Sequence, residues 1–536
     1  MHYQLPARFG IFLLWFVLTA VSLKVRPLFP VDETRYVSVA WEMWLRQDYL
    51  VPHLNGETYS HKPPLLFWLI NLLWMIFGVN ETVIRWIGPL FSLAGLFLTG
   101  KIAGLLWPEK KQIDTQVQFI LLGFFFWMLY GTLTMFDMML AFFVLLGIYS
   151  QIKLAICGLT WQRWGLFSLA IGGGVLTKGP VILLHLLPAA LLLPWWQPKD
   201  GRTFALSRWY LGLFLSVLAG AAIALCWAIP AGLSGGEAYR NAIFLGQTQG
   251  RIVNSFAHRL PWWWYVQKLP VLLLPWLLWP AVWRAMKNIR LDNQGTRFCL
   301  VWAIPVFVAF SLISGKRIHY LLPLMPAFAL LIAYALSSLV EKQQTVHTWL
   351  PGVIYALFGI VLCILPWLND SWQIKAELSD VSPVWGGLLL LFSGLLFLKP
   401  RYLQQAVFNI CVVSVAAFLV LEAALFSVFS YRYDMQPAAL HIQQLRARNK
   451  AVAFYTAKYH GQYNFVGRFK KPLTVLKQQT DLKQWMAQHA DGYVIKIIKV
   501  EQLNKGFMPY PHFPFKGKEV VFLPVSDLKT HAEWLQ

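Results

Sequence analysis

The sequence predicts an α-helical membrane protein that crosses the bilayer many times and ends in a small α/β domain. Of its 536 residues, 57% are hydrophobic and 13% are charged, and the mean hydropathy is +0.52. This composition is far too apolar for a soluble globular protein. Runs such as "QFILLGFFFWMLYGTL" carry no charge and approach the ~20 residues that a helix needs to cross the bilayer. A membrane β-barrel would alternate apolar and polar residues instead, so we expect helices.

The apolar runs predict about thirteen transmembrane helices. They lie near residues 9–25, 83–106, 117–134, 137–157, 163–176, 180–196, 208–231, 266–286, 297–315, 319–339, 349–367, 384–398 and 404–429. Lys24 and Arg26 follow the first run in place of a small-residue cleavage site, so we expect a retained signal anchor. The run 64–78 is short for a span and suits an interfacial or re-entrant helix, so it is not among the thirteen.

The net charge is +22, and many of the Lys and Arg residues lie in short loops between the predicted spans. In a soluble protein such a charge would suggest nucleic acid, but here it is typical of cytoplasmic loops or of contact with anionic lipid phosphate. With the N-terminus inside, the inside loops include "WPEKKQ", "WQPKDGRTFALSR", "WRAMKNIRLDNQGTR" and "LKPRY". The short outside loops hold only Lys178, Lys316, Arg317 and Lys375. Thirteen spans then place the C-terminal part outside.

Two domains are predicted. Residues 1–429 form the transmembrane domain, with long outside loops near 26–82 and 232–265. In residues 430–536, helix-like and strand-like patterns alternate, which indicates an α/β domain. The five cysteines lie in or beside apolar runs, so neither a disulfide framework nor a thiolate metal site is expected. No phosphate-binding glycine loop of the nucleotide-binding types occurs.

Charged and polar residues from separate segments are predicted to gather on the outside face. The first long loop supplies Asp32, Glu33, Arg35 and Lys62; junctions with spans supply Asp137, Lys178, Lys316, Arg317, His319 and Tyr320; and the second long loop supplies Arg251, His258 and Arg259. Several cations at a membrane surface can hold a phosphate or diphosphate. A nearby carboxylate can act as general base on a hydroxyl, with its pKa raised by burial.

Each candidate also has a purely structural interpretation. Asp137 could cap a helix, Lys178 could extend its ammonium group to the interface, and His258 and His319 could be structural hydrogen bonders. The aromatic run 262–265 fits an interfacial belt better than a sugar platform. Asp32 and Glu33 could be a solvated pair.

The stretches "PVDETRYVSVAWEMWLRQDYLVPHLNGETYSHKPPLLFWLINLLWMIFG", "LTKGP", "AHRLPWWWY" and "GKRIHYLLP" closely resemble the bacterial aminoarabinose lipid A transferase group. These enzymes are relatives of the protein O-mannosyltransferases, are similar to glycosyltransferase families 39 and 83, and share the GT-C architecture. The resemblance covers most of residues 1–340 in order; the remaining spans and the tail match in layout only.

The resemblance implies an inverting glycosyltransferase of the bacterial inner membrane that acts on the periplasmic side, where the C-terminal domain would also lie. Its donor would be a polyprenyl (undecaprenyl) phosphate sugar, with 4-amino-4-deoxy-L-arabinose as the first sugar to consider. Its acceptor would be lipid A or another periplasmic molecule. Which sugar and which acceptor are used stays open.

The family motifs fall on specific residues of this chain. The motif acid falls on Asp32, with Glu33 and Arg35 beside it, and the second acid falls on Asp137. Ligands for the donor phosphate fall on Lys62, on Arg251 after a one-residue shift, and on Lys316 and Tyr320. The chain departs from the family pattern at one position that bears on which sugar is used. Relatives commonly carry an acid next to the phosphate-binding lysine, where it can contact the amino group of the sugar. This chain instead reads Tyr59-Ser60-His61-Lys62-Pro63.

Other functions also fit parts of the sequence. A transporter or flippase for a lipid-linked anion would place its polar site near the bilayer midplane and show internal repeats, whereas these charges gather at one face. A structural membrane anchor predicts no clustered acids. Asp32, Glu33 and Asp137 could bind a divalent metal, although lysines alone can neutralise a phosphate. We expect membrane lipids as partners, no nucleic acid, and a monomer.

Overall fold

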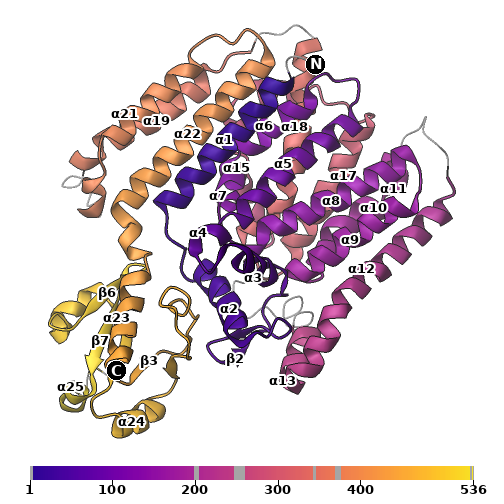
Figure 1. Ribbon diagram of the computed structural model, residues 1–536. Coiled ribbons are helices and arrows are strands. Elements are labelled where there is room, and N and C mark those ends of the chain that lie inside the picture. Colours follow the sequence, from indigo (N-terminus) through magenta and orange to yellow (C-terminus); the bar gives the residue numbers. More distant parts are fainter. Residues whose placement is uncertain are drawn as a thin grey trace. The chain divides into compact units, whose positions relative to one another are not determined.

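The computed structural model describes residues 4–197, 204–246, 260–341, 346–368, 376–531 and 534 (Figure 1). The chain divides into two compact units. The first comprises Met1–Val25, Ser60–Leu66 and Phe77–Ala424, and the second comprises Arg26–Tyr59, Phe67–Ile76 and Leu425–Gln536.

The first unit is built of helices. They are α1 (Gln4–Val25), α4 (Glu81–Ile84), α5 (Ile87–Leu106), α6 (Ile113–Gly123), α7 (Phe125–Gly131), α8 (Phe136–Cys157), α9 (Trp161–Lys178), α10 (Val181–Leu191), α11 (Leu193–Trp196), α12 (Leu206–Ser234), α13 (Gly236–Asn241), η1 (Ala242–Gly246), α15 (Trp264–Leu272), η2 (Trp276–Leu278), α16 (Pro280–Met286), α17 (Gln294–Leu312), η3 (Ile318–Leu324), α18 (Met325–Glu341), α19 (Trp349–Ile364), η4 (Leu365–Trp367), η5 (Ala376–Asp380), α21 (Val384–Ser393), η6 (Gly394–Leu396) and most of α22 (Leu403–Phe429).

Eight helices among the described residues are long and apolar enough to cross a membrane, or nine if the bent pair α6 and α7 is one span. The chain is therefore a multi-pass integral membrane protein. Each of the thirteen predicted runs forms helix, but fewer than thirteen of the described helices are long and apolar enough to cross a membrane. The run 163–176 forms α9, which does not meet the same criteria, and the run 180–196 is divided into α10 and α11. The runs 266–286 and 384–398 are also divided into shorter pieces.

Contacts with residues 274–276 stabilise the break between α6 and α7. The two helices meet at 77°, and the backbone N–H of Phe125 donates to the Leu274 carbonyl at 3.3 Å. Trp276 Nε1 donates to the Ile120 carbonyl at 2.8 Å. A Cβ on Gly123 would lie 2.8 Å from the Trp276 ring, so glycine allows this close approach. Backbone groups freed by a broken helix are thus paired inside the protein, and α7 leads directly to α8.

Helices from the two ends of the first unit lie side by side. Figure 1 shows α1 along α22, and Ser22 Oγ of α1 donates to Glu422 Oε2 of α22 at 2.5 Å. Both residues are buried, so the carboxylate has a partner inside the bundle. All five cysteines are free thiols.

The second unit contains a five-stranded mixed sheet with the strand order β4-β3-β5-β7-β6. Strand β3 pairs in parallel with β4 and β5, and β7 pairs antiparallel with β5 and β6. The elements of this unit are α2 (Asp32–Arg46), β1 (His53–Leu54), β2 (Glu57–Thr58), most of α3 (Leu65–Phe77), η7 (Ser430–Arg432), α23 (Gln436–Ala447), β3 (Val452–Tyr455), β4 (Thr474–Leu476), α24 (Gln479–Gln488), β5 (Tyr493–Lys499), η8 (Val500–Gln502), η9 (Leu503–Phe507), β6 (His512–Phe515), β7 (Lys518–Pro524) and α25 (Val525–Thr530).

Alternating strand residues give the sheet a separate core on each face. Phe454 and Phe522 pack with α23 on one face, and Ala453 and Val521 pack with α24 and α25 on the other (Figure 1). This two-residue period is the one expected of a sheet covered on both sides. The small C-terminal domain of mixed type is confirmed, although β4, β6 and α25 carried too little pattern to be predicted.

Helix α2, near the start of the chain, packs on residues 461–469 near its end, in the same unit. Ser38 Oγ donates to the Gly461 carbonyl at 2.7 Å and accepts from the Phe465 N–H at 3.1 Å. Trp41 Nε1 donates to the Phe469 carbonyl at 2.9 Å. The apolar face of α2 is therefore buried against the C-terminal part of the chain.

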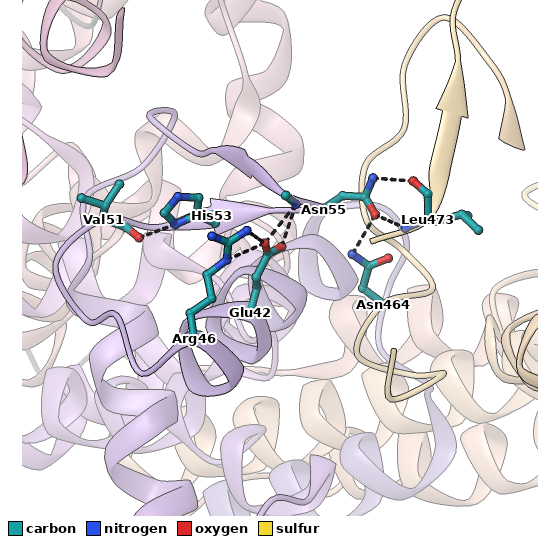
Figure 2. A network of polar contacts seen from close by, with 8 residues as sticks. Glu42, Arg46, Val51, His53, Asn55, Asn464 and Leu473 are labelled. Atoms are coloured by element: carbon teal, nitrogen blue, oxygen red, sulfur yellow. Dashed lines mark hydrogen bonds and ion pairs between the residues drawn. The ribbon is translucent and has the colours of Figure 1, made fainter. Parts of the chain in front are cut away.

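A β-hairpin after α2 is tied to the same C-terminal part (Figure 2). Its turn is Asn55-Gly56, with φ angles of 55° and 91°, the type I′ combination that these residues favour. The Gly56 N–H donates to Glu42 Oε1 at 2.9 Å. The Asn55 amide donates to the Leu473 carbonyl and accepts from the Leu473 N–H, both at 2.8 Å, and it also accepts from Asn464 Nδ2 at 3.3 Å.

We expect Asn55→Ala to destabilise this unit by about 1 to 3 kcal/mol, because the backbone groups of the buried Leu473 would lose their partners. Thermal unfolding of the full chain in detergent measures the effect. Asn288→Ala is the control, because its side chain donates to the Arg284 carbonyl at an exposed position. Equal unfolding temperatures for the two variants would contradict the role of Asn55.

Candidate functional site

Asp137 and Lys178 form a buried ion pair in the first unit. Asp137 lies in the first turn of α8, where a carboxylate is favoured by the helix dipole. Lys178 is the last residue of α9, and Gly179, with φ 81°, ends that helix. The Lys178 Nζ to Asp137 Oδ1 distance is 2.5 Å, and the side chains are 8% and 4% exposed. The sequence placed each residue at a junction but did not predict their direct pairing.

Segment η3 adds two aromatic side chains to this pair. His319 Nε2 lies 3.9 Å from Asp137 Oδ1, and its Nδ1 lies 3.4 Å from the Tyr130 hydroxyl. Lys178 Nζ lies 4.9 Å from the centre of the Tyr320 ring. Residues predicted at three separate outside junctions are therefore brought together, and we call Asp137, Lys178, His319 and Tyr320 the Asp137 cluster.

Lys62 adds a second cation beside the Asp137 cluster. Its Nζ lies 5.6 Å from the centre of the ring of Phe136, the neighbour of Asp137. Lys178, His319 and Lys62 all interact electrostatically with the Asp137 carboxylate. One buried acid surrounded by these basic groups leaves local positive charge when His319 is neutral, and such a site suits a phosphate.

His185 is a further polar residue of this region that the sequence analysis did not identify. It lies on α10, is fully buried, and interacts electrostatically with Lys178. Its ring centre is 5.1 Å from that of Phe310. Neither ring nitrogen has a hydrogen-bond partner among the described residues. A single histidine within the apolar run "VILLHLLP" was the available signal, since buried polar groups in membrane helices are costly and often functional.

Lys316 and Arg317 precede η3. Lys316 is 3% exposed and donates to the Leu260 carbonyl at 2.9 Å and the Ile313 carbonyl at 2.5 Å. Burial lowers the pKa of Lys316. The Arg317 carbonyl accepts from the Tyr265 hydroxyl at 2.9 Å. In this arrangement Lys316 fixes the turn that precedes His319 and Tyr320.

The acids of the first predicted loop lie in the second unit, at the start of α2. Glu33 is fully buried and accepts from the Phe29 N–H at 2.9 Å. Asp32 forms an ion pair with Arg35, and the Asp32 side chain is 41% exposed. Burial opposes the charge of Arg35, but Tyr59, Tyr36 and Asp32 together raise its pKa. Glu33 is thus placed as a structural acceptor, whereas Asp32 keeps an accessible carboxylate.

His460 contacts the same ion pair from the C-terminal part. Its Nδ1 lies 3.2 Å from Arg35 Nη1. Burial, followed by the positive charges of Arg35 and Lys458, lowers the pKa of His460 to about 4. Nothing in the surrounding sequence "AKYHGQY" distinguishes His460 as a site residue.

This pKa predicts a loss of stability in mild acid. Between His460's ordinary pKa of 6.5 and about 4, the unfolded chain takes up a proton on His460 that the folded chain does not. Stability therefore falls as pH falls through this window. We expect His460→Gln to unfold with a weaker pH dependence there, as measured by thermal unfolding of the full chain. His531→Gln, at an exposed site of the same unit, should keep the original dependence; identical profiles for all three proteins would exclude the effect.

The remaining candidates cannot be assigned a position. Arg251, His258 and Arg259 lie outside the described residues. No group of three or more His, Cys, Asp or Glu side chains that could hold a metal ion is found in the part of the chain that the structure describes.

Comparison with known families and sequences points to lipid-linked sugar transferases. Residues 61–227 match the family model described as dolichyl-phosphate-mannose-protein mannosyltransferase. The undecaprenyl phosphate-alpha-4-amino-4-deoxy-L-arabinose arabinosyl transferase of Pectobacterium atrosepticum is 27% identical over 363 residues, which cover 66% of this chain and 64% of the relative. A second enzyme so named, from Pseudomonas fluorescens, is 29% identical over 373 residues, covering 68% of this chain and 65% of the relative.

The fold resembles that of one solved structure over nearly the whole chain. The crystal structure of ArnT from Cupriavidus metallidurans bound to undecaprenyl phosphate superposes with a TM-score of 0.75 at 19% identity, covering 97% of this chain and 98% of that one. In sequence, the alignments span less than two thirds of the length of the two relatives above. The resemblance to this glycosyltransferase group is confirmed, and the fold is ArnT-like.

Proposed function

We propose that this chain is a membrane glycosyltransferase that moves a sugar from a polyprenyl phosphate donor to an acceptor on the periplasmic side of a bacterial inner membrane. The observation that carries the proposal is the Asp137 cluster, with Lys62 beside it, within a helical unit of ArnT-like fold. Undecaprenyl phosphate is the expected lipid, 4-amino-4-deoxy-L-arabinose the first sugar to test, and lipid A the first acceptor.

The donor phosphate is assigned to basic residues. Lys62 is its main ligand, supported by Arg251 and Lys316, with Arg35 and Tyr320 as further contacts. Lys178, Arg259 and Arg317 add positive charge, and His258 can donate a hydrogen bond. As the bond from sugar to phosphate breaks, negative charge grows on the departing lipid phosphate. Fixed positive charge stabilises that charge most strongly in the transition state, so no acid is required to protonate the leaving group.

Asp32 is assigned to the acceptor, as its general base. An acceptor hydroxyl transfers its proton to the Asp32 carboxylate as its oxygen attacks the anomeric carbon, and the configuration there inverts. If the acceptor is a lipid phosphate that is already ionised, Asp32 orients it instead and stabilises positive charge on the sugar ring. Asp137, paired with Lys178, faces the sugar, and Glu33 positions the start of α2.

A transfer assay tests the proposal. The full-length protein is incubated with undecaprenyl phosphate carrying radiolabelled 4-amino-4-deoxy-L-arabinose and with extracted outer-membrane lipid. Label that becomes covalently attached to lipid A supports the proposal. If the labelled donor crosses the membrane without losing its sugar, the protein is a flippase. If the label neither moves nor leaves the donor, transfer from this donor is rejected. An arm with exhaustive chelation separates phosphate neutralisation by lysines from a divalent ion bound by Asp32, Glu33 or Asp137.

A protein O-mannosyltransferase-like activity is the second candidate. It is favoured by the family model matched by residues 61–227 and by Ser60-His61 preceding Lys62, where the aminoarabinose group commonly carries an acid. A parallel arm with polyprenyl phosphate mannose and periplasmic protein extract tests it. Label on protein, with none on lipid A, would select this candidate.

We expect Lys62→Ala to raise the KM for the lipid-linked donor and to lower kcat/KM by about 10²-fold or more, since the variant loses a charged ligand of a group whose charge grows in the transition state. Steady-state transfer rates at varied donor concentration measure both effects. Lys24→Ala removes an exposed lysine of α1 and serves as the control. A normal KM and kcat for Lys62→Ala would remove Lys62 from the site.

A further inference from the structure

The first unit contains a cavity far from the Asp137 cluster. Its volume is about 860 Å³, and Arg8 of α1, Lys101 at the end of α5 and Gln118 of α6 are among the residues that line it. A cavity of this size is in the range that holds a small molecule or a lipid headgroup.

The cavity and the Asp137 cluster lie at opposite ends of α5. A Cβ on Gly88, near the start of α5, would lie 2.1 Å from the Leu133 carbonyl oxygen, which places this end of α5 beside the turn before α8 and Asp137. Lys101 lies near the other end of this 20-residue helix, which is about 30 Å long. The cavity is therefore too far away to be part of the proposed transfer site.

The walls of the cavity combine positive charge with apolar surface. The charged residues that line the cavity are Arg8, Lys101, Lys110, Lys111 and Asp114. The single carboxylate, Asp114, lies 3.5 Å from Arg8. Within the described part of the chain, neither Lys101 nor Lys111 makes an ion pair. The cavity thus has more positive charge than its own acid can neutralise, which favours an anionic ligand.

The apolar part of the cavity is rigid on one side and open on another. Trp107 donates from Nε1 to Asn293 Oδ1 at 2.7 Å and stacks on Tyr334 with ring centres 4.8 Å apart, so this wall is fixed. Phe97 and Gly104 of α5 also line the cavity. A Cβ on Gly104 would meet no atom within 4 Å, so the space beside it is free in the described structure.

We propose that this cavity binds the phosphodiester headgroup of an anionic phospholipid, with Lys101 and Lys111 contacting the phosphate and an acyl chain lying along Phe97 and Gly104. Three observations support a lipid over a free anion. The cavity pairs cations with apolar wall, and it lies between the ends of helices long and apolar enough to cross a membrane. Two of its lysines, Lys110 and Lys111, belong to a loop whose charge is typical of the cytoplasmic face. This site is independent of the proposed transfer reaction.

Lipid binding to the full-length protein tests the proposal. Detergent-solubilised protein is titrated with dioleoylphosphatidylglycerol or with neutral dioleoylphosphatidylcholine, and bound lipid is counted by native mass spectrometry. We expect phosphatidylglycerol to bind and to resist competition by millimolar inorganic phosphate. Equal binding of the neutral lipid would overturn the proposal. Displacement by inorganic phosphate would also overturn it, in favour of a free-anion site.

Three variants locate the binding. Lys101→Gln/Lys111→Gln should weaken phosphatidylglycerol binding about tenfold or more. Lys287→Gln/Lys399→Gln makes the same charge change at exposed residues outside the cavity and should leave binding unchanged. Gly104→Leu fills the cavity without changing charge; it should weaken binding while the protein keeps its unfolding temperature. Normal binding by Gly104→Leu, or an equal loss in both lysine pairs, would contradict the proposed location.

Discussion

Asp32→Asn is expected to lower kcat for sugar transfer by about 10²- to 10⁴-fold, the usual contribution of a positioned general base. The amide keeps the size of the carboxylate and can still accept a hydrogen bond from Arg35, but it cannot take a proton from the acceptor. Because the Asp32 side chain is 41% exposed, its replacement should leave the fold intact. The KM for the donor should change little, since the donor phosphate is assigned to other residues.

The matched control is Asp491→Asn. Asp491 is an exposed aspartate of the same unit that also pairs with a basic residue, Lys450, at 2.9 Å. This variant should retain the original kcat. Single-turnover rates with saturating donor, together with unfolding temperatures for both proteins, separate chemistry from folding. If Asp32→Asn transfers sugar at the normal rate, Asp32 is not the base.

Breaking the Asp137–Lys178 pair is expected to have the largest effect on stability. Lys178→Met leaves the Asp137 carboxylate, 4% exposed, without its partner at 2.5 Å, while His319 Nε2 remains 3.9 Å away. Removal of one partner from a buried pair costs about 3 to 5 kcal/mol. Asp137→Leu, which leaves the buried Lys178 ammonium, should cost a similar amount.

A double variant distinguishes the structural role of this pair from its role in transfer. Asp137→Leu/Lys178→Met removes both charges, so it should be more stable than either single variant, yet it should stay inactive. The control is Arg290→Met/Asp292→Leu at an exposed pair, where the side chains are 74% and 68% exposed, and no change in unfolding temperature is expected. Recovery of transfer in the double variant at Asp137 and Lys178 would show that the pair serves folding alone.

The sequence predicted helices wherever long apolar runs occur, but it did not predict where those helices break. The run 117–134 was interpreted as one span, and the structure divides it at Gly123, where the close approach of Trp276 decides the geometry. That contact joins residues 153 positions apart, so no local pattern could reveal it. In the run 266–286, by contrast, Pro270, Pro275 and Pro280 were visible signals of a broken helix.

The sequence predicted which residues belong to the candidate site, but it did not predict which of them contact one another. Asp137, Lys178 and His319 were identified because charged or titratable groups at the ends of apolar runs need a reason to be there. Their pairing could not be predicted, since it depends on how α8, α9 and η3 pack. His460 shows the opposite limit. It contacts Arg35 from 425 positions away, and an isolated histidine in a polar segment carries no signal of such a contact.

The packing of α2 on residues 461–469 constrains the order of biosynthesis. The hydrogen bond from Trp41 to the Phe469 carbonyl spans 428 positions. At ~5–20 residues per second, the ribosome needs roughly 20 to 90 seconds to make the intervening chain. During that time, the helix that carries Asp32 lacks the surface that buries its apolar face. A nascent chain cut short before residue 461 would expose this face to proteases and chaperones, so the enzyme's first acidic motif becomes structurally complete only after residues 461–469 have been made.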